Sequence, residues 1–150
     1  MSDLGPAEFM AILDRADGYK REPNKSRGLL AGRSVTLYFN KPSTRTRISF
    51  ETAVARLGWL PVTVWPSDLQ MGRGETIEDT ARVISRYPAA CVPRPFADEE
   101  IRRFSRAATI PVINALTDGH HPCQALADLM TLREEFGALA GLKLAYVGAG

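Results

Sequence analysis

Apolar residues recur in two alternating patterns along the chain. Short runs rich in β-branched and aromatic residues predict strands, whereas apolar residues spaced three and four positions apart predict amphipathic helices. The predicted strands cover residues 34–39, 60–65, 89–92, 110–113 and 142–147. The predicted helices cover residues 6–18, 44–57, 75–87, 97–107 and 122–136. Because strands that alternate with such helices form parallel βαβ units, the sequence predicts an α/β domain, a parallel sheet with helices on both faces.

The connections between these segments carry glycine and proline where helices end. Gly58 suits the end of the helix at 44–57, and Pro88 cannot continue the helix at 75–87. The long connection 66–74 contains two glycines, which favours a mobile lid or a segment donated to a neighbouring subunit.

Composition and charge narrow the class of protein. The chain of 150 residues is 45% apolar and 24% charged, which is typical of a soluble globular protein. With 19 basic and 17 acidic residues, the net charge of +2 is too balanced for a general nucleic-acid surface. The apolar runs are too short to cross a membrane, no secretory leader opens the chain, and two cysteines cannot make a disulfide framework. We therefore expect a cytoplasmic protein that binds neither nucleic acid nor membrane.

The C-terminal segment 142–150 has the pattern of a strand that runs into a glycine turn. A domain seldom ends at such a point, so the sequence predicts that this chain is a piece of a longer protein. Gly148 and Gly150 also suggest a dinucleotide-binding turn, but that pattern needs a following helix and a distal acidic residue, and we give it no weight.

The densest group of hydrogen-bonding residues, Ser43 to Arg47, lies between the strand at 34–39 and the next helix. In an open parallel sheet, ligands bind beyond the carboxyl ends of the strands. Ser43 suits the N-cap, and the unpaired amides and positive dipole of a helix N-terminus suit a phosphate. Because residues two apart point in different directions on a helix, we assign Arg45 to the ligand and expect Arg47 to pair with Glu51. The alternative is a capped helix with solvated arginines.

A second group, around His120 and His121, leads into the helix at 122–136. The histidine pair could donate to a carbonyl oxygen, and Gln124 could hold an amide-like group. A zinc site is not favoured, because the chain has no second His or Cys group at ligand spacing. A nucleophilic Cys123 is not favoured either, because no separate histidine remains as its base.

A third candidate, Arg94, follows the strand at 89–92 and is stiffened by a proline on each side. An arginine held in this way loses little entropy when it binds an anion. A surface arginine at a turn is the alternative.

Three segments, 43–51, 72–82 and 121–128, resemble the aspartate/ornithine carbamoyltransferase family, and the ornithine branch is the nearer one. The resemblance covers nearly the whole chain. It implies two α/β domains, the first binding carbamoyl phosphate and the second an amino acid, with active sites between the subunits of a homotrimer or of a multiple of trimers. On that basis, residues 1–136 form the carbamoyl-phosphate-binding domain, which ends in an interdomain helix at about 122–136. Residues 137–150 would begin the second domain.

The resemblance also implies roles for individual residues. The phosphate would be held by the first segment and by one arginine, namely by Ser43, Thr44, Arg45, Thr46 and Arg94. Thr46, Arg94 and His121 would be catalytic, because they would polarise the carbamoyl oxygen. Gln124 would bind the carbamoyl amide, and Gln70 lies on the loop that reaches a neighbouring subunit's site.

The activity implied is transfer of the carbamoyl group of carbamoyl phosphate to the δ-amino group of L-ornithine, giving L-citrulline and phosphate, a step of arginine biosynthesis or of the urea-cycle type. No metal or organic cofactor is implied. The aspartate branch is similar in the first and third segments but has a lysine where this chain has Arg73. Other amines also remain alternatives, because the discriminating residues lie mainly in the second domain. A further alternative is that this chain alone is a carbamoyl-phosphate-binding module without turnover.

Overall fold

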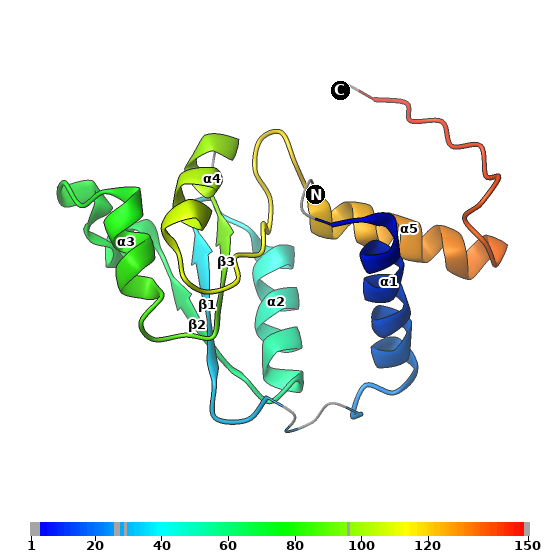
Figure 1. Ribbon diagram of the computed structural model, residues 1–150, viewed down its shortest axis with the longest axis horizontal. Coiled ribbons are helices and arrows are strands. Elements are labelled where there is room, and N and C mark those ends of the chain that lie inside the picture. Colours follow the sequence, from blue (N-terminus) through cyan, green and yellow to red (C-terminus); the bar gives the residue numbers. More distant parts are fainter. Residues whose placement is uncertain (1–3, 26–27, 29, 96, 149–150) are drawn as a thin grey trace.

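A parallel sheet forms the centre of the computed structural model, which describes residues 4–25, 28, 30–95 and 97–148. Its strands are β1 (Ser34–Phe39), β2 (Leu60–Val64) and β3 (Ala90–Arg94), in the order β2-β1-β3 (Figure 1). Val35 of β1 lies opposite Pro61 of β2 on one side and Ala90 of β3 on the other. All three strands therefore end at the same edge of the sheet.

Helices cover both faces of the sheet, as the sequence predicts (Figure 1). One face packs against α2 (Thr44–Arg56), whose Val54 joins the cluster formed by Val35, Leu37 and Phe39. The other face packs against α3 (Ile77–Ile84) and α4 (Asp98–Ala107). Cys91 lies in that second cluster, with Ala81 of α3 and Phe104 of α4. Successive residues of a strand point to opposite faces, so these short strands fill two cores.

The predicted strand at 110–113 is wrong in extent, because only Val112 bridges Cys91 of β3. The amide of Ile113 donates to the Cys91 carbonyl at 2.9 Å, and the amide of Ala115 donates to the Pro93 carbonyl at 3.0 Å. In a regular parallel ladder, the backbone N–H of residue 93 would donate the hydrogen bond that lies between these two. Residue 93 is a proline, which has no N–H. The ladder therefore stops after one bridge.

The predicted strand at 142–147 is also wrong. This segment is irregular and leaves the body of the structure (Figure 1). Leu144, Tyr146 and Val147 are 76%, 79% and 95% exposed. A strand requires a paired neighbour, and this segment has none within the part of the chain that the structure describes. Gly150 of the suggested dinucleotide turn lies outside the described residues.

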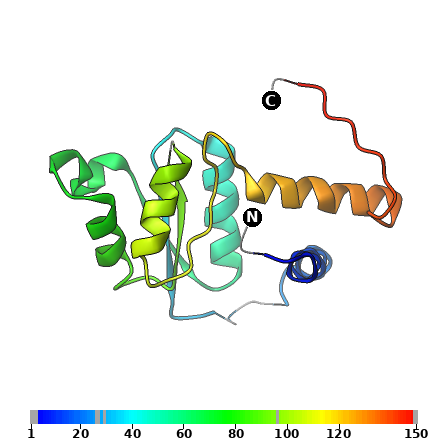
Figure 2. The ribbon, with the colours of Figure 1, turned by 45° about the horizontal axis from the view of Figure 1, so that its top comes forward.

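The two remaining helices, α1 (Pro6–Arg21) and α5 (Pro122–Phe136), pack against each other beside the sheet (Figures 1 and 2). Arg133 of α5 joins them, because its Nη1 donates to Asp14 Oδ1 at 2.7 Å and its Nη2 donates to Asp17 of α1. Lys20 and Glu134 form a more exposed pair at 2.7 Å. Helix α1 continues past its predicted end at residue 18, since Gly18 does not adopt a positive φ.

The connection 66–74 is built from two short 3₁₀ turns, η1 (Pro66–Asp68) and η2 (Gln70–Arg73). Asp68 anchors the first turn by accepting a hydrogen bond from the amide of Trp65 at 2.8 Å. Gly74 ends the second turn with a φ of 97°, a conformation that favours glycine. Among the described residues, no helix is long and apolar enough to span a bilayer.

Candidate functional site

A cavity of about 730 Å³ opens where the N-terminus of α2, the end of β3 and the start of α5 meet. It collects most of the site residues that the sequence predicts. The residues that line it include Ser43, Thr44, Arg45, Thr46, Arg94, His121 and Gln124. These residues come from three segments separated by more than twenty positions in the sequence, and each segment lies at the carboxyl end of a strand or at a helix start.

The N-terminus of α2 forms one wall and is left without a side-chain cap. Ser43 occupies the N-cap position with an extended backbone (φ −157°), but its hydroxyl accepts no hydrogen bond from the helix. The amides of Thr44, Arg45 and Thr46 have no hydrogen-bond partner among the described residues. These N–H groups and the positive end of the helix dipole suit an anion.

The two arginines of this segment separate, as the sequence predicts, but Arg47 does not pair with Glu51. Arg45 lines the cavity. The guanidinium of Arg47 lies 5.4 Å from the centre of the Trp65 ring, and Glu51 accepts a 2.6 Å hydrogen bond from Thr63. Because Trp65 lies across the face that Arg47 occupies, a cation–π contact replaces the expected ion pair.

Arg94 links β3 to the α2 wall. Its Nη1 donates to Thr46 Oγ1 at 2.7 Å, and its Nε is buried without a partner. Burial lowers the pKa of the guanidinium below its usual value. Pro93 and Pro95 on either side are both buried, so the backbone that carries this arginine is fixed. The side chains of Arg94 and Thr46 therefore lie side by side in the wall of the cavity and can both donate hydrogen bonds into it.

His121 is the N-cap of α5, and this position determines its tautomer. Its Nδ1 accepts a hydrogen bond from the amide of Gln124 at 3.3 Å. An amide nitrogen can only donate, so Nδ1 carries no proton and Nε2 carries the proton of the neutral ring. Burial and the positive charge of Arg94 lower the pKa of His121. The ring is thus a neutral donor.

Gln124 is oriented by Asp128 one turn further along α5. Its Nε2 donates to Asp128 Oδ1 at 2.8 Å, which leaves its carbonyl oxygen as the group able to accept from a ligand. Cys123 also lines the cavity, but its thiol lies 3.5 Å from the Asn114 carbonyl and burial raises its pKa. A protonated thiol is a poor nucleophile, so the geometry does not support a role for Cys123 as a nucleophile.

Gln70 is the predicted site residue that the structure places elsewhere. It lies in η2 and accepts a 3.4 Å hydrogen bond from Arg73, outside the cavity. The loop that carries it lies along the other face of the sheet, next to α3 (Figure 1).

Sequence reasoning missed the residues that hold His121 in place. The Asp98 carboxylate at the start of α4 accepts a hydrogen bond from Thr117 and lies 2.9 Å from Nδ1 of His120. These two contacts, Thr117 first, lower the pKa of Asp98. A side chain on Gly119 would collide with the same carboxylate. Asp98 thereby fixes the loop before His121, and no local pattern marks this pairing because its partners are about twenty residues apart.

Ser49 and Phe50 also line the cavity and were not predicted. They lie three and four residues after Thr46, on the same face of α2, so helical periodicity could have found them. Among the described residues, no three His, Cys, Asp or Glu side chains are grouped to hold a metal ion.

The chain is similar to known carbamoyltransferases. A model of the carbamoyl-phosphate-binding domain of aspartate/ornithine carbamoyltransferases matches residues 1–134. The ornithine carbamoyltransferase of Acidothermus cellulolyticus is 55% identical over 148 residues, which are 99% of this chain and 47% of that protein. The chain thus spans about half the length of the curated relatives it matches.

Two solved structures show the same fold. The ornithine carbamoyltransferase of Thermus thermophilus matches with a TM-score of 0.88 and 42% identity, over 94% of this chain and 49% of that chain. The catalytic subunit of M. jannaschii aspartate transcarbamoylase matches with a TM-score of 0.81 and 39% identity, over 91% of this chain and 46% of that chain.

The environment of His121 makes its titration a test of this geometry. In an NMR titration, its imidazole should show a pKa below the usual 6.5. Because the unfolded chain binds this proton more readily than the native site, His121 should make the free energy of unfolding decrease as the pH falls below about 6.5. The substitution Arg94→Met should raise the pKa of His121, since it removes the nearby positive charge. A pKa of His121 at or above the usual value in the unaltered protein would contradict this arrangement.

Proposed function

The chain belongs to the aspartate/ornithine carbamoyltransferase family, and we propose that it supplies the carbamoyl-phosphate site of an ornithine carbamoyltransferase. The reaction is transfer of the carbamoyl group to the δ-amino group of L-ornithine, with L-citrulline and phosphate as products, a step of arginine biosynthesis. The observation that carries this proposal is the convergence of the α2 N-terminus, Arg94 and His121 on one cavity.

The α2 N-terminus suits the phosphate of the donor substrate. Three unpaired amides, the hydroxyls of Ser43 and Thr44 and the side chain of Arg45 supply donors around one point. A guanidinium can bind two phosphate oxygens at once, which a lysine cannot do. Arg94 adds a second positive charge at the other side of the same wall.

The carbamoyl group would then lie between Arg94 and His121. Thr46, Arg94 and the protonated Nε2 of His121 would donate to its oxygen, while the carbonyl oxygen of Gln124 would accept from its amide. When the ornithine nitrogen forms its bond to the carbamoyl carbon, that oxygen gains negative charge. The C–O bond to phosphate then breaks, phosphate leaves, and the attacking nitrogen loses a proton. Donors aimed at such an oxygen each contribute about 3 kcal/mol to lowering the barrier.

The choice of ornithine over aspartate rests on the relatives rather than on the cavity. The aspartate transcarbamoylase subunit shares the fold of this domain at 39% identity, so the fold alone does not separate the two substrates. The curated relatives that match over the whole chain at 45–56% identity are named ornithine carbamoyltransferases. They favour ornithine, and aspartate is the weaker alternative.

We further propose that residues 1–136 are one domain and that 137–150 begin a second domain, which binds the amino acid. The exposed apolar side chains of residues 144–147 support this division. We also place the protein in the cytoplasm, where its two free thiols would remain reduced.

Assembly into a homotrimer would give Gln70 a role. The residue lies outside its own chain's cavity, and the family resemblance implies that its loop reaches the site of a neighbouring subunit. Strand β2 is an edge strand with Leu60 and Val62 64% and 39% exposed, so this side of the sheet can be covered by another copy.

Replacing Arg45 tests the phosphate assignment. Arg45→Ala should weaken carbamoyl phosphate binding about a hundredfold in calorimetry, because charge-assisted hydrogen bonds are lost. The melting temperature should stay nearly unchanged, since the Arg45 side chain is exposed. Arg56→Ala, at the exposed opposite end of α2, is the matched control and should bind normally. Equal affinity in the two variants would refute the assignment.

A turnover assay tests whether this chain alone is a binding module or an active enzyme. We expect this chain alone to bind carbamoyl phosphate weakly and to make no detectable citrulline, because the amino-acid site is assigned to the second domain. A colorimetric citrulline assay with carbamoyl phosphate and L-ornithine measures this. Turnover close to that of a complete ornithine carbamoyltransferase would show that residues 1–150 already hold both substrate sites.

Self-association tests the role given to Gln70. Sedimentation velocity at rising protein concentration should show a trimer, whose formation buries the exposed side of β2. Leu60→Lys should shift the equilibrium towards monomer, because it places a charge in that contact. A species that stays monomeric at high concentration would argue against a subunit-spanning site.

A further inference from the structure

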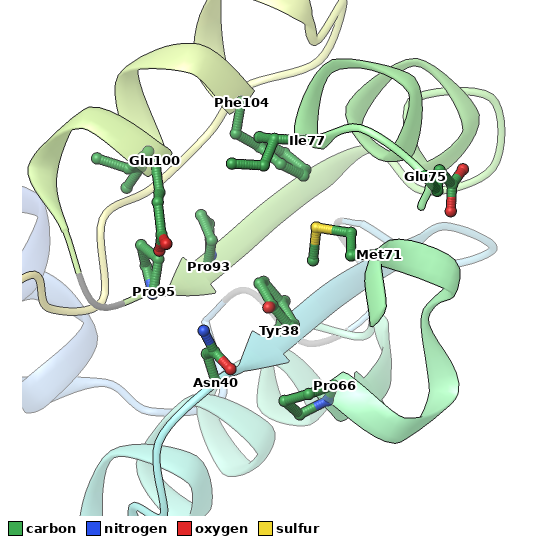
Figure 3. Close-up of a pocket in the computed structure, with 11 residues that line it drawn as sticks. Tyr38, Asn40, Pro66, Met71, Glu75, Ile77, Pro93, Pro95, Glu100 and Phe104 are labelled. Carbon is green, nitrogen blue, oxygen red and sulfur yellow. The ribbon is translucent and has the colours of Figure 1, made fainter. Parts of the chain in front are cut away.

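Asp98 is the first residue of α4, and its carboxylate contacts the loop that precedes His121. Helix α4 gives this carboxylate a fixed support. Its Phe104 is only 3% exposed and belongs to the core cluster that contains Cys91 of β3. Figure 3 shows Phe104 beside Ile77 of α3, which packs against the same cluster. The position of the carboxylate is therefore set by the sheet.

The Asp98 carboxylate contacts the loop at two points. One oxygen accepts a hydrogen bond from the hydroxyl of Thr117, which is 1% exposed, and the other lies 2.9 Å from Nδ1 of His120. Thr117 and His120 are also joined directly, because the amide of Thr117 donates to the His120 carbonyl at 2.9 Å. The carboxylate lies so close to Gly119 that a side chain there would collide with it. Asp98 thus fixes a turn whose last residue is the neighbour of His121.

The two adjacent histidines use the same ring atom in opposite ways. Hydrogen bonds from Thr117 and His120 lower the pKa of Asp98, so its carboxylate is ionised at neutral pH and can only accept. Nδ1 of His120 therefore carries a proton and donates, whereas Nδ1 of His121 accepts from the amide of Gln124. His120 is tied to α4, and His121 keeps its Nε2 proton for the cavity.

A second contact of this loop is more exposed. Asp118 forms an ion pair with Lys41, but the Asp118 side chain is 64% exposed, and exposed ion pairs contribute little to stability. The Asp98 carboxylate, in contrast, is 26% exposed and accepts from a buried hydroxyl. It also contacts the residue directly before His121, so it controls the position of that ring more closely than the Lys41 pair does.

We propose that Asp98 is a positioning residue for His121 and, through it, for recognition of the carbamoyl group. Its effect on the carbamoyl group rests on the proposed function, whereas its effect on His121 does not. Arg94 lies at the end of β3, and α4, which carries Asp98, packs on the same strand. Both donors assigned to the carbamoyl oxygen are thereby fixed to β3. Inorganic phosphate, which needs only the α2 N-terminus and Arg45, does not depend on Asp98.

NMR titration of His121 tests the positioning, because loss of charge and loosening of the loop act in opposite directions. Deleting a negative charge lowers the pKa of a nearby histidine. A loosened loop exposes the ring to water and moves it away from Arg94, which raises the pKa towards the usual 6.5. We expect a rise in Asp98→Ala. Glu99→Ala, the matched control, removes the next carboxylate of α4, which pairs with Arg102, and should leave the pKa of His121 unchanged.

Two milder variants keep the test valid if Asp98→Ala does not fold. Thr117→Val removes one of the two contacts without a change of charge and with little change of shape, and it should also raise the pKa of His121. Asp98→Asn keeps an oxygen that can accept from Thr117, and its amide can donate to the other tautomer of His120. It should therefore retain most of the pKa shift of His121.

Carbamoyl phosphate and inorganic phosphate form a matched pair of ligands for calorimetry. Asp98→Ala should weaken the binding of carbamoyl phosphate about tenfold, as expected for the loss of one well-placed hydrogen bond, and should leave the binding of inorganic phosphate unchanged. Arg45→Ala should weaken the binding of both ligands, because Arg45 is assigned to the phosphate that they share.

Three outcomes would overturn the proposal. These are a pKa of His121 that is unchanged or lower in Asp98→Ala, a pKa of His121 that is unchanged in Thr117→Val, or equal losses of affinity for the two ligands in Asp98→Ala. If the unaltered protein binds no carbamoyl phosphate, the proposed function is refuted, and the titration of His121, which needs no ligand, still decides the positioning.

Discussion

The parallel pairing of β1 with β2 and β3 is the constraint on which the rest of the structure depends. β1 lies between two neighbours, and its Val35, Leu37 and Phe39 fill the core on one face of the sheet, whereas Cys91 of the neighbouring β3 lies in the core on the other face. Parallel pairing also brings the carboxyl ends of the strands to one edge. The segments that follow β1 and β3 therefore begin side by side, although Thr46 and Arg94 are 48 residues apart. Their 2.7 Å hydrogen bond is a consequence of this register.

The residues that line the carbamoyl-phosphate cavity differ in charge. The uncapped amides of α2 and the two arginines make one side strongly positive. Burial lowers the pKa of His121, the charge of the nearby Arg94 lowers it further, and the amide of Gln124 donates to its Nδ1. A neutral imidazole beside a guanidinium donates a hydrogen bond without adding a competing charge. The N-terminus of α5 thus fixes both the position of His121 and the ring nitrogen that carries its proton.

Sequence patterns predicted the elements that have local signals. β1 and α5 match their predicted bounds, because a β-branched run and a proline-led apolar stripe identify them directly. The strands at 110–113 and 142–147 were wrong, since pairing depends on a partner that no local pattern reveals. In the same way, the motif residues of the cavity were found from the sequence, whereas the hold of Asp98 on the His121 loop was not. Arg47 was misplaced because its contact with Trp65 is a tertiary one.

The proline at position 93 has a consequence for local stability. Between Ile113 and His121, the chain is attached to β3 by the hydrogen bond from the Ala115 amide to the Pro93 carbonyl, and it is held further by the contacts around Asp98 and by the ion pair between Lys41 and Asp118. The segment can therefore open without breaking any of the bonds that join β3 to β1. Local opening of the histidine loop and global unfolding of the sheet are separate events with separate free energies, so this loop can exchange its amide hydrogens while the sheet remains protected.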